Sequence, residues 1–327
     1  MVLKLSQKKA SQLENSANDI SRLPVTKLTE ISFFNSYKKP GIPVIITGLL
    51  EGENEWNLDY LCQQLGDLEF PLRYYGKDRY QLDKRHWQNI GSGVTGPPQP
   101  FTEYAAILRN GEARKNDVYM AKCALKNTPL REERSLKKIT ANLEQLGFKK
   151  SASDFNIWLG PGGHVECLHY DLMDGTLIQL YGVKKVVLFP PSQTANLSPF
   201  PIYVHLYRGF KLRCWFSQVY PENPDLKTFP QFEEALRYKQ EIYLQPGEAL
   251  FIPCGWWHEV TAVGEEMVCS VNRFWRVYPT PRAIFSWTRL RVHLGSVATI
   301  PYILVALVKA LFSSQRKEKV KEILRSL

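Results

Sequence analysis

The sequence contains no paired cysteine motif. Its six cysteines are scattered between residues 62 and 269 of a 327-residue chain and never form a C-x-x-C pair. So few and so dispersed cysteines are typical of a reducing compartment and exclude the disulfide framework of a small secreted domain. The first residues, Met-Val-Leu-Lys-Leu-Ser-Gln-Lys-Lys, lack the apolar core of a secretory signal peptide. We therefore expect an intracellular, soluble protein, cytoplasmic or nuclear.

Long apolar runs are also missing. The longest one, residues 299 to 312, is 14 residues long and contains Lys309. A bilayer span needs about 20 apolar residues, so we expect no transmembrane segment. No internal repeat is visible either.

Acidic residues are scarce near the end of the chain. From residue 279 onward nine basic residues face only two acids, Glu318 and Glu322, so this segment carries +7 of the formal net charge of +10. Such a run is either a solvated helix face or a contact surface for nucleic acid or an anionic membrane. The segments after Pro281 have helical periodicity, and Pro301 predicts a break between two helices.

The first half of the chain mixes helix and strand signals. Residues 42 to 48 indicate a buried strand. Residues 57 to 66 carry apolar side chains at helical spacing, with a glycine at the stop position. Residues 86 to 101 contain three glycines and three prolines and predict a loop. A helix over 100–108 and a strand over 117–121 are expected to follow.

From residue 155 the sequence changes to short apolar or aromatic runs separated by glycine and proline. Many short strands at regular spacing favour a β-sandwich or a barrel. The expected strands cover residues 155–160, 165–170, 176–182, 185–191, 240–244, 248–253, 256–263 and 267–275.

Two histidines and one aspartate form the main candidate site. His169 and Asp171 are two residues apart in a strand-like stretch, so their side chains face the same way. His258 lies 89 residues further on, after Ile252-Pro-Cys-Gly-Trp-Trp, a turn that would deliver it to the mouth of a barrel. Two imidazoles and one carboxylate, with positions left open, suit a non-haem Fe(II) oxygenase. We therefore predict that His169, Asp171 and His258 are catalytic metal ligands.

His164 and Glu166 form a competing pair with the same spacing. In a regular strand, residues 164 and 166 face away from residues 169 and 171, and only a bulge would bring the two pairs together. We therefore place His164 outside the metal site. The remaining histidines lack partners at useful spacing and are expected to be structural or to lie on the surface: His86, His205 and His293.

Several stretches together resemble the JmjC (cupin-8) hydroxylases. They are His169-Tyr-Asp, residues 179–191, residues 246–258 and Val271-Asn-Arg-Phe-Trp, with further likeness at residues 39–48. Each motif is weak alone, but the combination is specific and covers roughly residues 25 to 278. The expected fold is mainly β, with a double-stranded β-helix (jelly-roll, cupin) core, flanking N-terminal α/β elements and a C-terminal helical segment. The resemblance also implies Fe(II), 2-oxoglutarate and O2.

The resemblance further implies residues that bind the co-substrate. Lys184 matches the family lysine that pairs with the distal carboxylate of 2-oxoglutarate, and its neighbour Lys185 could be confused with it. A lysine suits this role because a buried carboxylate needs a cationic partner. Tyr119 resembles a family tyrosine that hydrogen-bonds the same carboxylate, Asn272 resembles an asparagine near the metal, and Thr176 is assigned to the same pocket.

Two positions depart from the family pattern. Glu166 stands where several relatives have a threonine, and Gly175 stands where they have an asparagine. Both positions line the 2-oxoglutarate pocket in those relatives. A carboxylate beside an anionic co-substrate is unfavourable, so we expect Glu166 to turn away, to bind a cationic substrate group or to mark an altered pocket.

The predicted activity is an Fe(II)- and 2-oxoglutarate-dependent dioxygenase that hydroxylates a C–H bond, with succinate and CO2 as co-products. The substrate would be a protein side chain or a modified tRNA base, whose phosphates the basic segment would contact. The alternative is a non-catalytic, cupin-like metal-binding interaction module. We expect a polar segment at 1–24, the catalytic domain at 25–278 and a basic helical segment at 279–327. The family's use of C-terminal helices favours a homodimer over a membrane-surface role for that last segment.

Overall fold

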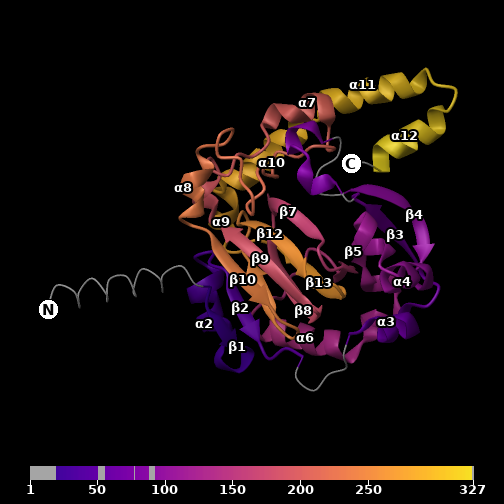
Figure 1. Ribbon diagram of the computed structural model, residues 1–327. Coiled ribbons are helices and arrows are strands. Elements are labelled where there is room, and N and C mark those ends of the chain that lie inside the picture. The colour runs from indigo at the N-terminus through magenta and orange to yellow at the C-terminus, as the bar shows by residue number, and fades with distance from the viewer. Residues whose placement is uncertain (1–19, 51–55, 77, 88–92, 326–327) are drawn as a thin grey trace.

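The chain folds around two facing β-sheets (Figure 1). The computed structural model describes residues 20–50, 56–76, 78–87 and 93–325. Within these residues, a nine-stranded sheet has the order β1-β2-β11-β8-β13-β6-β5-β3-β4 and a four-stranded sheet has the order β10-β9-β12-β7. Most of the predicted polar segment at 1–24 lies outside the described residues.

Eight consecutive strands divide equally between the two sheets. β6, β8, β11 and β13 are neighbours in the larger sheet, while β7, β9, β10 and β12 form the smaller one. This division is that of a double-stranded β-helix and confirms the mainly β jelly-roll prediction. Each strand overlaps one expected from the sequence: β6 Asn156–Pro161, β7 Val165–Tyr170, β8 Asp174–Tyr181, β9 Val183–Phe189, β10 Gln240–Leu244, β11 Ala249–Ile252, β12 Trp257–Val263 and β13 Met267–Trp275.

Apolar side chains from both sheets meet in a buried cluster. Leu177 of β8 and Leu250 of β11 come from the larger sheet, and Val186 and Leu188 of β9 come from the smaller one. Burying each such side chain stabilises the fold by about 1.5–3 kcal/mol. This packing holds the two sheets together and so fixes the relative position of residues that face each other across them.

The N-terminal elements extend the larger sheet and cover it. The helix α3 begins after Asn57, whose side chain accepts a hydrogen bond from the Tyr60 amide, and it ends at Gly66, as the sequence predicts. The helix predicted over 100–108 and the strands predicted near 42–48 and 117–121 are also present. The bounds are β1 Arg22–Pro24, α2 Glu30–Phe33, β2 Val44–Thr47, α3 Leu58–Leu65, β3 Glu69–Tyr74, α4 Phe101–Arg109, α5 Glu112–Asn116, β5 Val118–Ala124 and α6 Arg134–Gln145.

The loop predicted over residues 86–101 is wrong in its second half. Residues Val94–Pro100 form β4, which pairs with β3 at the edge of the larger sheet. An edge strand needs hydrogen-bonding partners on one side only, so it tolerates prolines that a central strand would exclude. Residues 88–92 of the same prediction lie outside the described part of the chain.

The C-terminal segment is helical, as expected. It comprises α9 Thr280–Ile284, α10 Trp287–Ala298, α11 Ile300–Leu311 and α12 Arg316–Arg325, while α7 His205–Arg208 and α8 Phe232–Leu236 precede it in the chain. The predicted break is confirmed, because α10 ends at Ala298 and Pro301 lies in the first turn of α11. An ion pair between Arg282 and the fully buried Asp174 ties α9 to β8. In Figure 1, α11 and α12 lie beyond the two sheets.

Helices α10 and α11 carry a large exposed apolar surface. Its members share an exposed fraction above one third: Trp287, Leu290, Leu294, Val297, Ile300, Leu304, Val305, Val308 and Leu311, with Phe312 just beyond. The 25 residues from Trp287 to Leu311 are long and apolar enough to cross a bilayer by length and composition alone, and 17% of their most apolar stretch is buried inside the fold. The absence of a transmembrane segment therefore stays a prediction.

Candidate metal centre

Two neighbouring strands and the loop after one of them bring three possible metal ligands together. His169 lies near the end of β7, Asp171 follows that strand, and His258 lies in β12 directly opposite His169. One ligand atom from each of these residues lies within 4.8 Å of the other two. His258 Nε2 and Asp171 Oδ2 lie 3.5 Å apart. The structure thus assembles the predicted triad from positions that are far apart in the sequence.

Backbone carbonyls determine which nitrogen of each imidazole faces the cluster. His169 Nδ1 lies 2.8 Å from the Cys167 carbonyl oxygen, and His258 Nδ1 lies 3.0 Å from that of Trp256. A carbonyl oxygen only accepts hydrogen bonds, so each neutral ring must carry its proton on Nδ1. Each Nε2 therefore keeps a free lone pair, which is the form in which histidine binds a metal.

The surroundings of the triad keep His258 neutral and hold the ring of His169 in place. Burial, reinforced by the neighbouring His169, lowers the pKa of His258 to about 4. The Phe216 ring stacks on His169 with centroids 4.8 Å apart and an interplanar angle of 11°. Two imidazoles and one carboxylate fit the donor set of a non-haem Fe(II) site.

A β-bulge in β7 changes which side chains share the cavity. His258 lies opposite His169, but Val260 lies opposite Glu166, so three steps along β7 match two along β12. Glu166 consequently lines the same cavity as His169, and so does His164. The expectation that residues 164 and 166 face away from the triad is therefore wrong, because strand parity fails at a bulge.

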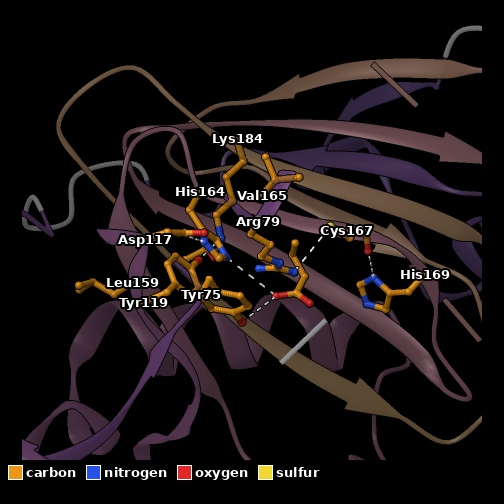
Figure 2. A network of polar contacts seen from close by, with 12 residues as sticks. Tyr75, Arg79, Asp117, Tyr119, Leu159, His164, Val165, Cys167, His169 and Lys184 are labelled. Atoms are coloured by element: carbon orange, nitrogen blue, oxygen red, sulfur yellow. Dashed lines mark hydrogen bonds and ion pairs between the residues drawn. The ribbon is translucent and has the colours of Figure 1, made fainter. Parts of the chain in front are cut away.

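His164 nevertheless belongs to a different cluster. Its Nδ1 lies 2.6 Å from Asp117 Oδ1, and its ring stacks on Tyr119 with centroids 3.7 Å apart. Figure 2 shows His164 grouped with Asp117 and Tyr119, away from His169. Among the described residues, the group of possible metal ligands contains the triad and not His164.

Lys184 is a buried cation without an ion-pair partner among the residues that the structure describes. Its side chain is almost fully buried, and Nζ lies 2.5 Å from Ser270 Oγ and 3.4 Å from the Tyr119 hydroxyl. Burial lowers the pKa of Lys184 to about 8. Lys185 faces the other way and pairs with Glu222 at 2.8 Å. A carboxylate placed beside Lys184 would supply the negative charge that its surroundings lack.

All the predicted site residues line one cavity of about 200 Å³. Asn272 accepts a hydrogen bond from Trp158 Nε1, at 2.9 Å. Thr176 Oγ1 accepts one from Trp275 Nε1, at 3.1 Å, so it is oriented by the sheet. The seven residues that share this cavity are His169, Asp171, His258, Lys184, Tyr119, Asn272 and Thr176.

Glu166 lies among groups that stabilise its negative charge. The Tyr75 hydroxyl donates to Oε2 at 3.4 Å, and His164 Nε2 lies 3.9 Å from the same atom. Burial raises the pKa of Glu166, but His164, His169 and Arg79 outweigh burial and hold it below its usual range. Its charge is thus offset by the protein itself, which argues against one of the three alternatives, that Glu166 binds a cationic substrate group.

Several cavity residues escaped the sequence reading. Ser270 does not line the cavity itself but contacts Lys184, and it lies two residues before Asn272 on the same face of β13, so strand parity could have identified it. Arg213, Trp215 and Phe216 lie between α7 and α8 in a segment without helix or strand periodicity, where no sequence signal was available. Of the other histidines, His205 is fully buried, whereas His86 and His293 are exposed.

Comparison with known proteins gives one family match and several relatives. The model of the cupin-like domain matches residues 30–280. Lysine-specific demethylase JMJ31 of Arabidopsis thaliana is 28% identical, over 76% of this chain and 48% of that protein. Human tRNA wybutosine-synthesizing protein 5 is 28% identical, over 79% of each chain. Lysine-specific demethylase 8 of Xenopus tropicalis is 37% identical, over 74% of this chain and 50% of that protein. The chain thus spans about half the length of the two demethylases.

Proposed function

Because this chain belongs to the cupin-like JmjC domain family, we propose that it is an Fe(II)- and 2-oxoglutarate-dependent oxygenase that hydroxylates a C–H bond. JmjC homologues are oxygenases of this type, and the relatives include demethylases and a tRNA-modifying protein. The observation that carries the proposal is the cluster of His169, Asp171 and His258, in which both imidazoles keep an Nε2 lone pair for a metal.

The residues of the cavity have separate roles in this proposal. His169, Asp171 and His258 would hold Fe(II). When bound, Fe(II) with 2-oxoglutarate and O2 supplies oxidative decarboxylation to succinate and CO2, coupled to hydroxylation of the substrate. Lys184 would pair with the distal carboxylate of 2-oxoglutarate, a role that its burial and its lack of an ion-pair partner in the described chain support. Tyr119 would donate a second hydrogen bond to that carboxylate.

Glu166 and Gly175 are compatible with this co-substrate. The negative charge of Glu166 is stabilised by its own neighbours, and Glu166 forms no ion pair with Lys184. Lys184 is therefore left for the carboxylate of the co-substrate. At Gly175 an added Cβ would make only ordinary contacts, 3.8 Å from the Phe274 ring and 3.9 Å from the Ile252 carbonyl oxygen, so the glycine leaves to the cavity the space of the asparagine side chain that relatives carry there. We propose that this space enlarges the pocket beside the triad.

The test of the proposal is Fe(II)-dependent formation of succinate from 2-oxoglutarate by the purified full chain. Succinate is expected with Fe(II) and O2, and it should disappear when the metal is chelated or O2 is removed. If the protein binds Fe(II) in the cavity but forms no succinate, the oxygenase proposal fails and a non-catalytic, metal-binding interaction module takes its place. The substrate class proposed is a protein side chain or a modified tRNA base, as the named relatives suggest.

We also propose that the exposed apolar surface of α10 and α11 pairs two copies of the chain. Burying an exposed leucine or valine contributes about 1.5–3 kcal/mol, so a charge at Leu304 or Val308 should weaken the dimer by at least about tenfold. Light scattering should give a dimer for the unmodified chain and a monomer for Leu304→Glu/Val308→Glu at the same concentration.

Gln315→Glu is the matched control for this prediction. It adds one negative charge, as Leu304→Glu or Val308→Glu does by itself, at an exposed polar position between α11 and α12, and it should leave the dimer intact. A monomeric unmodified chain that sediments with anionic vesicles would contradict dimerisation and support the membrane-surface alternative.

A further inference from the structure

Three cations line the triad's cavity from outside the jelly-roll core. Arg73 lies on β3, Lys122 on β5, and Arg213 in the segment between α7 and α8. We refer to Arg73, Lys122 and Arg213 as the cation cluster. In the described part of the chain, no carboxylate lies within 4.0 Å of any of these three cations, the distance at which an ion pair would form. Three unrelated segments thus deliver positive charge to one cavity without neutralising it.

The surroundings of Arg213 show that its charge is poorly compensated. Its Nε donates to the Phe210 carbonyl oxygen at 3.2 Å, and its guanidinium lies 5.6 Å from the centre of the Trp215 ring. Burial, and then the like charge of Arg73, lower the pKa of Arg213, and the attraction of Glu166 opposes them only in part. Two guanidinium groups that repel each other in a partly buried cavity favour an anion between them.

The backbone at Lys122 also brings its side chain to the cavity. Lys122 has a φ of +55°, in the left-handed region that residues other than glycine rarely occupy, and the β5–β6 pairing shifts register around it. Such a bulge redirects a side chain, and it persists only where the surrounding structure supports the strain. The Lys122 Nζ lies 5.8 Å from the centre of the Phe274 ring, which lines the same cavity.

The charges of the cavity do not balance without a further anion. Four cations line it, namely the cation cluster and Lys184, against the two carboxylates of Glu166 and Asp171. The two positive charges of Fe(II) and the two negative charges of 2-oxoglutarate would cancel each other. An excess of two positive charges therefore remains for the substrate to meet.

Aromatic rings lie beside these cations. Trp158 of β6 and Phe274 of β13 line the cavity, and so does Trp215. Cations that contact phosphates, together with rings on which bases stack, are the combination by which proteins hold single-stranded nucleic acid. An acidic peptide would use the cations but would have no need of the rings.

We propose that the cation cluster is a phosphate subsite that holds a nucleotide of a single-stranded polynucleotide substrate beside the triad. The inference rests on the proposed oxygenase function and specifies the substrate class for the same cavity. Arg73 and Arg213 provide the fork-shaped donors that match phosphate oxygens, and Lys122 adds a third charge. Trp158 and Phe274 provide faces for the adjoining base.

The test measures binding of a fluorescein-labelled single-stranded RNA hexamer to the full chain, loaded with Fe(II) under nitrogen. Arg213→Gln should weaken binding by about tenfold, the effect of losing one good charged contact. It should also reduce the slope of log Kd against log salt concentration by about one. Arg213→Lys, which keeps the charge, should bind several-fold more tightly than Arg213→Gln.

Lys211→Gln is the matched control, because Lys211 is exposed, lies two residues from Arg213 and does not line the cavity. It should change the affinity by less than about twofold. Equal losses in Lys211→Gln and Arg213→Gln would overturn the proposal. Tighter binding of a labelled hexaglutamate peptide than of the RNA would overturn it in favour of an acidic protein substrate.

The basic tail is controlled for separately. Four of the α12 basic residues are changed to glutamine in a tail variant: Arg316, Lys317, Lys319 and Lys321. If Arg213→Gln weakens the RNA binding of this variant further, the subsite is supported. If the tail variant already binds no RNA, the RNA contact belongs to the tail alone and the proposal fails. The same preparation is assayed for succinate. A failed RNA test with normal succinate formation rejects the subsite only, whereas missing succinate rejects the oxygenase function itself.

Discussion

Asp171→Ala is expected to lower the rate of Fe(II)-dependent succinate formation by about 1,000-fold or more. Asp171 is the only carboxylate in the described ligand group, and its Oδ2 lies 3.5 Å from His258 Nε2. Removing one partner from a charged cluster of this kind costs about 3–5 kcal/mol, and each 1.36 kcal/mol changes a rate tenfold. Succinate is measured by NMR at saturating 2-oxoglutarate and Fe(II), and the affinity for Fe(II) is measured in parallel.

His293→Ala provides the control for the loss of a side chain without the loss of a ligand. His293 lies on α10 and is exposed, so its replacement should leave succinate formation within about twofold of the unmodified rate. His169→Ala should match Asp171→Ala, because it removes an imidazole from the same group. If either triad variant keeps more than a tenth of the rate, these residues do not hold the catalytic metal.

Lys184→Met is expected to raise the KM for 2-oxoglutarate by about 100-fold, whereas Lys185→Met should change it by less than about threefold. Lys184 is buried beside Ser270 and Tyr119. Lys185, in contrast, pairs with Glu222 away from the cavity. Truncating one partner of a buried charge pair costs about 2–5 kcal/mol, and 100-fold corresponds to about 2.7 kcal/mol within that range. Initial rates of succinate formation over a range of 2-oxoglutarate concentrations give the KM of each variant.

The pKa of Lys184 adds a pH dependence to this prediction. Burial lowers that pKa to about 8, so the side chain is mostly protonated at pH 7 and mostly neutral at pH 9. Only the protonated form attracts a carboxylate, so 2-oxoglutarate should bind about tenfold more weakly at pH 9 than at pH 7. Lys184→Met should lack this dependence. If Lys184→Met and Lys185→Met have equal KM values for 2-oxoglutarate, a residue other than Lys184 binds its distal carboxylate.

Most of the strands could be predicted because their patterns are local. Residues 240–244 and 267–275, for example, have the same bounds in the sequence reading as in β10 and β13. Short apolar runs bounded by glycine and proline carry this information within a few residues. The strand β4 was missed because its prolines are compatible with a strand only at a sheet edge, and position within a sheet is not a local property.

The sequence alone predicted the proposed triad and the lysine of the cavity: His169 and Asp171 by their spacing, His258 by the turn before it, and Lys184 through the family resemblance. Only the tertiary structure decided what surrounds them. The bulge that turns Glu166 toward His169 depends on how β7 pairs with β12, a register between strands almost 90 residues apart. Arg73 and Arg213 reach the same cavity through folding of segments that carry no common pattern. Local patterns therefore predicted the proposed metal ligands, whereas long-range pairing set the charge of the pocket in which they lie.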